Sequence, residues 1–170
     1  ADDSGKADWV DALNNGMSRT YVLKGFAESV EFKQLCDTYA IKQGTVEIKE
    51  NRDKNRQVTG FVSRLYTIAL NRSADVSGLN DWTGKLLEKK QTPKQVASGF
   101  VFSKEMTNRN LSNREFVSML YRTMMDREPD ESGLNDWVAR LQAGTTREKV
   151  FDGFADSTEF NNIVKAYGLK

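Results

Sequence analysis

Apolar side chains recur along this chain at spacings of one, three and four residues, which is the pattern of an amphipathic helix. The clearest stretch carries six of them on one broad stripe: Phe116, Val117, Leu120, Tyr121, Met124 and Met125. Ser112 followed by Glu115 forms a capping box ahead of this stripe, and Pro129 stands after it. The pattern therefore predicts a helix that begins near Ser112 and ends before Pro129.

Three shorter helices are predicted after this one. The first follows the phrase Asp-Glu-Ser-Gly, where the side chain of Asp130 or Ser132 can accept hydrogen bonds from free backbone amides. Its apolar positions are Leu134, Trp137, Val138 and Leu141. The next two helices open at Thr146 and Ser157, whose hydroxyls are suited to the same capping role. One full copy is thus expected to be four short helices.

This pattern is repeated, and one phrase marks every copy. An aspartate is followed by a glycine three residues later and by a tryptophan four residues after that. The aspartates are Asp2, Asp75 and Asp130, and the tryptophans are Trp9, Trp82 and Trp137. Each copy then carries a glycine inside its third helix, at Gly25, Gly99 and Gly153. Glycine costs about 1 kcal/mol relative to alanine within a helix, so its recurrence predicts a close approach between helices.

Two copies also have a leading helix with the pattern Phe-Val-x-x-Leu-Tyr. It is followed by Arg72 in one copy and Arg127 in the other, which we interpret as structural clamps that close free carbonyls or pair with a nearby aspartate. The first copy lacks this helix, since Asp2 aligns with Asp75. We therefore expect a fragment of a longer protein. Its incomplete copy should leave apolar surface that docks on the second copy or on another molecule.

The fold class predicted from these elements is all-α, with tandem four-helix repeat units packed side by side. The expected divisions are a truncated first repeat at 1–42, a polar connector at 43–58, a second repeat at 59–111 and a third repeat at 112–170. Within the connector, Val46-Glu47-Ile48 alternates too briefly to decide between a strand and a helical turn, so its conformation stays open.

Composition argues against several classes of partner. The 170 residues include 25 Lys and Arg against 24 Asp and Glu, interleaved along every segment, which disfavours nucleic acid. No run of about 18 apolar residues is present, so membrane insertion is not expected. The single cysteine, Cys36, excludes an intramolecular disulfide and a multi-thiolate zinc site. It aligns with Val164 on an apolar helix face, which favours a buried, inert thiol.

The sequence offers no catalytic, cofactor-binding or metal-ligating residue that we can assign. Histidine is absent, and no nucleophile elbow, phosphate-binding loop or dinucleotide fingerprint is present. The acids of the Asp-x-Ser-Gly-x-x-Asp phrase suit calcium in principle, but they lack the alternate ligands and distal glutamate of a calcium loop. Helix capping is therefore the favoured interpretation. An enzyme is not expected; a hydrolase that uses carboxylates alone is the remaining alternative.

The tryptophans also allow two interpretations. An indole can be a platform on which a sugar ring stacks. However, Trp82 lies at helical spacing from Leu79 and Leu86, which favours a place in the core.

Three phrases of the third copy resemble a known family. They are Phe-Val-x-x-Leu-Tyr, Arg-x-x-Asp-x-x-Gly-Leu-x-x-Trp and Gly-Phe-x-x-Ser-x-Glu-Phe, between Phe116 and Phe160, and they are similar to the bacterial domain-of-unknown-function family 4214. The resemblance covers nearly the whole chain apart from the connector. The second copy departs from it at Ser73-Ala74 and at Met106.

This resemblance implies small helical modules, frequently in tandem, within large secreted or surface-attached bacterial proteins, and it implies no catalytic residues. We accordingly expect an extracellular or cell-surface module without cofactor, which serves as a spacer or protein-interaction platform. Its expected partners are other domains of the parent protein or surface proteins. The alternative is a carbohydrate-binding module, with glycans as ligands.

Overall fold

All regular secondary structure of residues 2–170, the part of the chain that the computed structural model describes, is helical. The first repeat contains α1 (Asp3–Asn14), α2 (Arg19–Ala27) and α3 (Val30–Thr38). The second contains α4 (Arg56–Ile68), α5 (Val76–Leu87), α6 (Pro93–Val101) and α7 (Lys104–Asn108). The third contains α8 (Asn113–Met125), α9 (Glu131–Gln142), α10 (Arg147–Ala155) and α11 (Thr158–Ala166). The prediction of an all-α fold of tandem four-helix units, with no leading helix in the first, is confirmed.

The helices begin at the residues that the sequence marks as caps. The second helix of each unit is capped by an aspartate that accepts a hydrogen bond from a glycine amide at 2.7–2.8 Å: Asp2 from Gly5, Asp75 from Gly78 and Asp130 from Gly133. Serine or threonine hydroxyls cap the next two helices of every repeat. The capping box predicted at Ser112 and Glu115 is confirmed, with both of its hydrogen bonds present.

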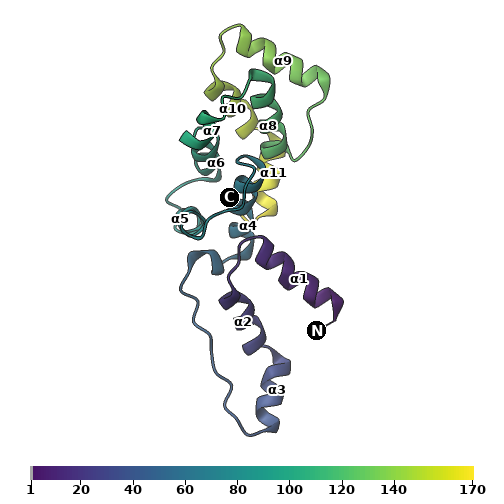
Figure 1. The fold of residues 1–170 in the computed structure, drawn as a ribbon, viewed down its shortest axis with the longest axis vertical. Coiled ribbons are helices and arrows are strands. Elements are labelled where there is room, and N and C mark those ends of the chain that lie inside the picture. The colour runs from purple at the N-terminus through teal and green to yellow at the C-terminus, as the bar shows by residue number, and fades with distance from the viewer. Residues whose placement is uncertain (1) are drawn as a thin grey trace.

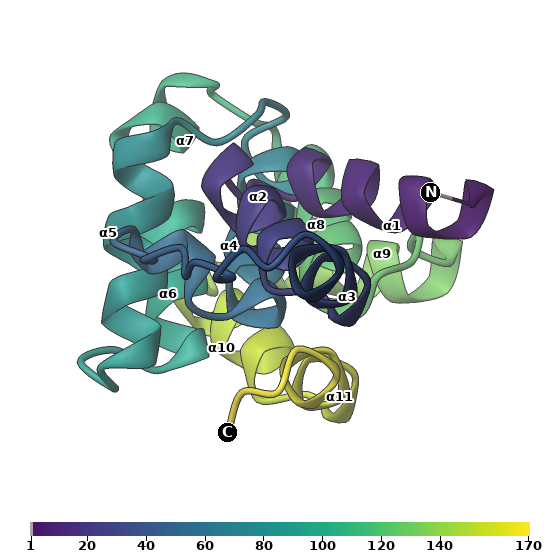
Figure 2. The ribbon, with the colours of Figure 1, turned by 90° about the horizontal axis from the view of Figure 1, so that it is seen from below.

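The core of the molecule joins the second and third repeats. The leading helices α4 and α8 contact each other, with α5 to α7 on one side and α9 on the other (Figures 1 and 2). Phe61 of α4 packs against Phe160 and Tyr167 near α11, with ring centroids 6.4 and 5.8 Å apart. Full burial of such a side chain stabilises the fold by about 1.5–3 kcal/mol. These two repeats therefore share one hydrophobic cluster.

The first repeat lies outside that cluster, at one end of an elongated molecule (Figure 1). The connector runs back along α2 and α3 without helix or strand pairing, and the amide of Val46 donates to the Glu28 carboxylate at 2.9 Å. The chain then forms a short 3-10 helix, η1 (Asn51–Asp53), and α4 begins at Arg56, inside the range 43–58 that the sequence assigns to the connector. The connector, whose conformation the sequence left undecided, is thus extended and then forms one helical turn.

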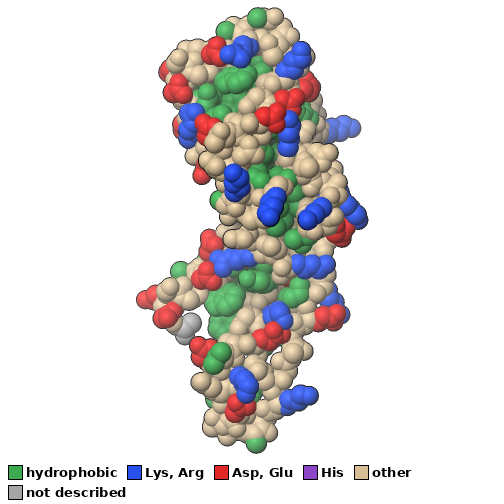
Figure 3. Space-filling view, turned by 180° about the vertical axis from the view of Figure 1, so that it is seen from behind, with side chains coloured by type: hydrophobic (Ala, Val, Ile, Leu, Met, Phe, Trp, Pro, Cys, Tyr) green, Lys and Arg blue, Asp and Glu red, His purple; other side chains and the backbone are tan. Residues whose placement is uncertain are grey.

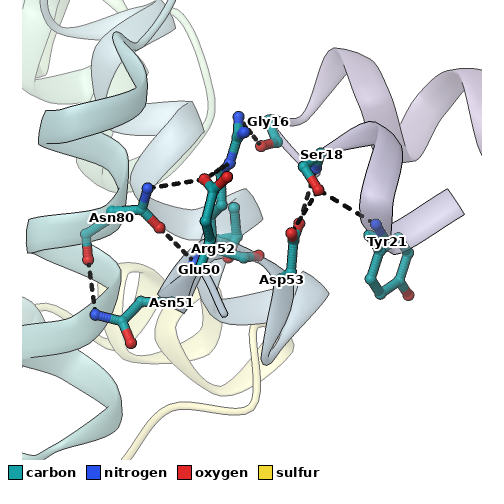
Figure 4. Close-up of polar contacts among 9 residues, drawn as sticks. Gly16, Ser18, Tyr21, Glu50, Asn51, Arg52, Asp53 and Asn80 are labelled. Atoms are coloured by element: carbon teal, nitrogen blue, oxygen red, sulfur yellow. Dashed lines mark hydrogen bonds and ion pairs between the residues drawn. The ribbon is translucent and has the colours of Figure 1, made fainter. Parts of the chain in front are cut away.

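Polar contacts hold the first repeat against η1 and α4. The buried carboxylate of Asp53 accepts hydrogen bonds from the Ser18 amide at 2.8 Å and the Ser18 hydroxyl at 2.5 Å (Figure 4). Arg52 donates to the carbonyl of Gly16 at 3.3 Å, and Arg56 pairs with Asp8 at 2.8 Å. Few apolar side chains of the first repeat are buried: Ala12, Met17 and Cys36. This junction is therefore mainly polar, whereas the junction between the other two repeats is apolar.

None of the helices in residues 2–170 combines the length and the apolar character that crossing a membrane requires.

Candidate interaction surface

Each repeat contains the same contact among a tryptophan, a glycine and a phenylalanine. The indole packs on the phenylalanine that follows the glycine, with ring centroids 5.2–5.4 Å apart: Trp9 on Phe26, Trp82 on Phe100, and Trp137 on Phe154. The six-membered ring also lies so close to Gly25, Gly99 or Gly153 that a Cβ there would have to displace it. The recurring glycines therefore allow two helices of each repeat to approach closely: α1 and α2, α5 and α6, or α9 and α10. All three indoles are half-buried.

In the two complete repeats, a tyrosine of the leading helix covers this contact. Tyr66 packs edge-on against Phe100, and Tyr121 does the same against Phe154, with ring centroids 4.7 and 5.0 Å apart. The tyrosine hydroxyl lies against Gly78 or Gly133, where it leaves no room for a Cβ. Burial raises the pKa of both tyrosines, so the hydroxyls stay neutral and can donate.

The arginine after each leading helix lies over the ring of that tyrosine. Arg72 is 4.9 Å from the Tyr66 centroid and Arg127 is 4.8 Å from the Tyr121 centroid. Each guanidinium also approaches the capping aspartate of the next helix, Asp75 at 3.8 Å and Asp130 at 3.5 Å. Arg72 forms a second, bidentate pair with Glu105 at 2.7 and 2.9 Å, and this pairing lowers the pKa of Glu105. The structure thus places both arginines between the leading helix and the cap of the next helix, and Arg72 also joins α7 through Glu105.

The first repeat has the same contact among tryptophan, glycine and phenylalanine, but no tyrosine covers it. Phe26 is 48 % exposed, whereas Phe100 and Phe154 are 2 % and 0 % exposed. The phenylalanine that ends the Ser-x-Glu-Phe phrase differs in the same way. Phe32 of the first repeat is exposed, whereas its equivalent in the third repeat, Phe160, is buried. Further apolar side chains of the same repeat are exposed: Val10, Leu13, Leu23, Val30, Leu35, Tyr39 and Ile41. Figure 3 shows apolar atoms gathered beside the projecting N-terminal arm. The predicted apolar surface is confirmed, and the second repeat does not cover it.

The polar groups that surround the tyrosine in the complete repeats have counterparts in this surface. Gly5 is equivalent to Gly78, and a Cβ there would meet only its own cap, Asp2, within 4 Å. Asp2 is equivalent to Asp75, and Glu31 is equivalent to Glu105. Both acids are exposed, and within residues 2–170 neither forms an ion pair.

Sequence reasoning did not identify two parts of this arrangement. Gly78 and Gly133 recur in the Asp-x-Ser-Gly phrase, but there they are explained by capping alone; their fixed pairing with a tyrosine upstream was the available signal. Asp53 lies in a polar stretch without periodicity, so nothing in the sequence indicated its burial.

A metal site, a reactive cysteine and a basic binding pocket have little support in the described residues. Residues 2–170 contain no cluster of three or more acidic, histidine or cysteine side chains that could hold a metal ion. Cys36 is a buried free thiol on α3. A half-open hollow of about 670 Å³ between α4 and α8 is lined by three arginines. Each of them already has a partner: Arg109 the Ala69 carbonyl, Arg114 Glu131, and Arg122 Glu128.

Comparison with known proteins gives one match. The family model described as "Domain of unknown function (DUF4214)" matches residues 1–36, 44–110 and 97–164. The first match covers α1, α2 and most of α3. Each of the others contains one leading helix and the three helices that follow it, although α11 is cut short in the third match. No curated protein and no solved structure matches the chain.

Proposed function

Since this chain belongs to the DUF4214 family of domains of unknown function, and since it is built of tandem helical repeats, we propose that it is a non-catalytic interaction module. Its setting is a larger secreted or cell-surface bacterial protein, in which the repeats also act as a spacer. Its partners are other domains of that protein or surface proteins. The setting rests on the family resemblance of the motif phrases.

One observation carries the proposal: the first repeat exposes side chains that the other repeats bury. Single exposed apolar residues are ordinary, but a contiguous group usually marks a binding surface. Phe26 and Phe32 are about half exposed, so a partner that covers them gains about 1 kcal/mol from each ring by area alone. The exposed group is also confined, because nine of the ten large exposed hydrophobics identified in residues 2–170 lie between Val10 and Ile41.

The electrostatics of the chain support a module without catalysis. A general acid needs a carboxyl whose pKa is raised by burial or by a second carboxylate. Among the described residues, each carboxyl with a resolved shift has a lowered pKa instead, as Glu50 does through hydrogen bonds from Asn80 and Arg52. A lowered pKa keeps such a carboxylate ionised at neutral pH.

Site-specific photo-crosslinking on the cells that produce the protein tests this function. A photoreactive amino acid replaces Phe26 in one variant and Val76 in the control, because these two side chains are equally exposed at 48 % and 50 %. We expect position 26 to give discrete covalent adducts with protein and position 76 to give none. Equal labelling at both positions, or no protein adduct at position 26, contradicts the proposal.

A carbohydrate-binding module is the second candidate, because three aromatic rings meet at the open repeat. Trp9 contacts both Tyr21 and Phe26, with centroids 6.1 and 5.4 Å apart. A glycan array distinguishes the two functions. Retention of a sugar by the chain, and its loss in Trp9→Ala, would favour the carbohydrate function.

A further inference from the structure

We propose that a hollow where all three repeats meet binds a neutral sugar ring. The hollow is half-open, has a volume of about 470 Å³ and lies between α1, α4 and the end of α11. Its lining combines one aromatic ring with polar side chains and a glycine: Asp11, Asn15, Arg56, Gln57, Gly60 and Tyr167. The inference goes beyond the interaction function and does not rest on it, because none of the exposed apolar side chains near Phe26 lines this hollow.

The charged side chains of the hollow neutralise each other. Arg56 donates hydrogen bonds to the carboxylate of Asp11 at 2.9 Å and to that of Asp8, outside the lining, at 2.8 Å. These bonds raise the pKa of Arg56, so the pair stays ionised. No further charged side chain of residues 2–170 lines the hollow. The lining therefore favours a neutral ligand over an anion or a cation.

Polar groups of the lining match hydroxyls that both donate and accept hydrogen bonds. The Asp11 carboxylate is held by Arg56 and by Asn15, whose amide donates to it at 3.0 Å, and it retains acceptor sites for a ligand. Among the hydrogen bonds found in residues 2–170, none uses the side-chain oxygen of Asn15, the amide of Gln57 or the hydroxyl of Tyr167. Neighbouring hydroxyls of a sugar ring can use all three groups.

Tyr167 supplies the apolar part of the hollow. Its ring packs edge-on against Phe61, with centroids 5.8 Å apart, and is only partly buried. Gly60 of α4 permits this position, because a Cβ there would lie 3.3 Å from the tyrosine ring. One face of a sugar ring consists of C–H groups that can pack on an aromatic ring while the hydroxyls reach polar neighbours. Sites for small ligands combine an apolar wall with a few polar groups in about 300–1,000 Å³, a range that includes this hollow.

This site is distinct from the ring cluster at Trp9. Asp8, Asp11 and Asn15 follow one another at spacings of three and four, so they share one face of α1. Trp9 lies on another face of the same helix, and it does not line the hollow. A sugar bound in the hollow would contact all three repeats at once.

The test is an NMR titration of the full chain with the methyl glycosides of glucose, galactose, mannose and N-acetylglucosamine. We expect at least one of the four to shift the amide signals of α1, α4 and the end of α11 together. Methyl glucuronate is the charged probe. We expect it to bind no more tightly than methyl glucoside, because the lining carries no excess charge.

Four variants locate the bound sugar. Gln57→Ala changes an exposed side chain, and Tyr167→Leu keeps an apolar contact with Phe61 but removes the aromatic ring. We expect each to weaken binding at least fivefold. Tyr39→Leu is the matched control, because Tyr39 is the equivalent tyrosine of the first repeat, is 68 % exposed and does not line the hollow. This control and Trp9→Ala should change the affinity less than twofold.

Several results would overturn the inference. They are no binding of the four glycosides, amide shifts confined to other helices, or equal affinities of Gln57→Ala and wild type. Tighter binding of the glucuronate would overturn the assignment of a neutral ligand. Binding that is lost in Trp9→Ala and kept in Gln57→Ala would place the sugar at the other ring cluster. If Tyr167→Leu alters the amide signals of α11 without sugar, Gln57→Ala alone decides.

Discussion

Replacing the motif phenylalanine with alanine should destabilise the three repeats by different amounts. Phe154 is fully buried, so Phe154→Ala removes the transfer free energy of the ring and leaves a cavity, which together lower the free energy of unfolding by about 3–5 kcal/mol. Phe100 is 2 % exposed and should lose a similar amount. Phe26 is 48 % exposed and lines no closed cavity, so Phe26→Ala loses about half of a transfer term of ~1.5–3 kcal/mol, or about 1 kcal/mol.

Urea unfolding followed by circular dichroism gives the global values for the three variants. Hydrogen exchange of α2, α6 and α10 gives the local ones, because repeats joined by different junctions need not unfold together. The reasoning is wrong if Phe26→Ala costs as much as Phe154→Ala. That result would mean that the face of the first repeat is covered in the purified protein.

Three other substitutions test separate parts of the structure. Asp53→Ala removes the buried acceptor at the junction and should lower hydrogen-exchange protection of α1 to α3 by about 1–3 kcal/mol. Gly99→Ala should lower the melting temperature even though alanine favours helix by about 1 kcal/mol, because its Cβ would lie 2.7 Å from the Trp82 ring. Glu105→Gln should destabilise the protein to urea at about pH 7, because Arg72 lowers the pKa of Glu105. This contribution is complete above the ordinary carboxyl pKa and is lost as pH falls through the lowered pKa, so the stabilities of wild type and variant should converge in acid below that pKa.

Each of these substitutions has a control at a comparable position. Glu47→Ala changes an exposed acid of the connector and should leave the protection of α1 to α3 unchanged. Gly44→Ala adds a Cβ with no atom within 4 Å and should not lower the melting temperature. Glu159 is the equivalent of Glu105 in the third repeat, and Glu159 forms no ion pair within the described residues. Glu159→Gln should therefore shift the urea midpoint at about pH 7 less than Glu105→Gln does. Controls as damaging as their counterparts would contradict the assigned contacts.

Most of the fold follows from local signals that the sequence states directly. The hydroxyl of Ser112 and the carboxylate of Glu115 satisfy amides of the same helix turn, so the start of α8 depends on residues three positions apart. The same holds for Asp130 and the other caps. The repeat then multiplies each local signal, which is why the order of the helices could be predicted.

Contacts between distant residues were harder to predict. The contact of the Tyr66 hydroxyl with Gly78 joins two helices, α4 and α5. The equivalent glycine of the first repeat, Gly5, has no tyrosine beside it, so its role is recognised only by comparison with the complete repeats. The burial of Asp53 depends on Ser18, 35 positions away, and one chain gives no signal for such a pair. What the periodicity did indicate was that a repeat without its leading helix leaves apolar side chains in water.

The contrast between the two junctions has a mechanical consequence. Phe61 of α4 packs against Phe160 of α11 and against Tyr167 just after it, and apolar contacts of this kind depend little on ionic strength. The first repeat is attached through one extended segment and through ion pairs such as Arg56 with Asp8, which dissolved salt weakens. Raising the salt concentration should therefore loosen the attachment of the first repeat more than the contact between the second and third repeats.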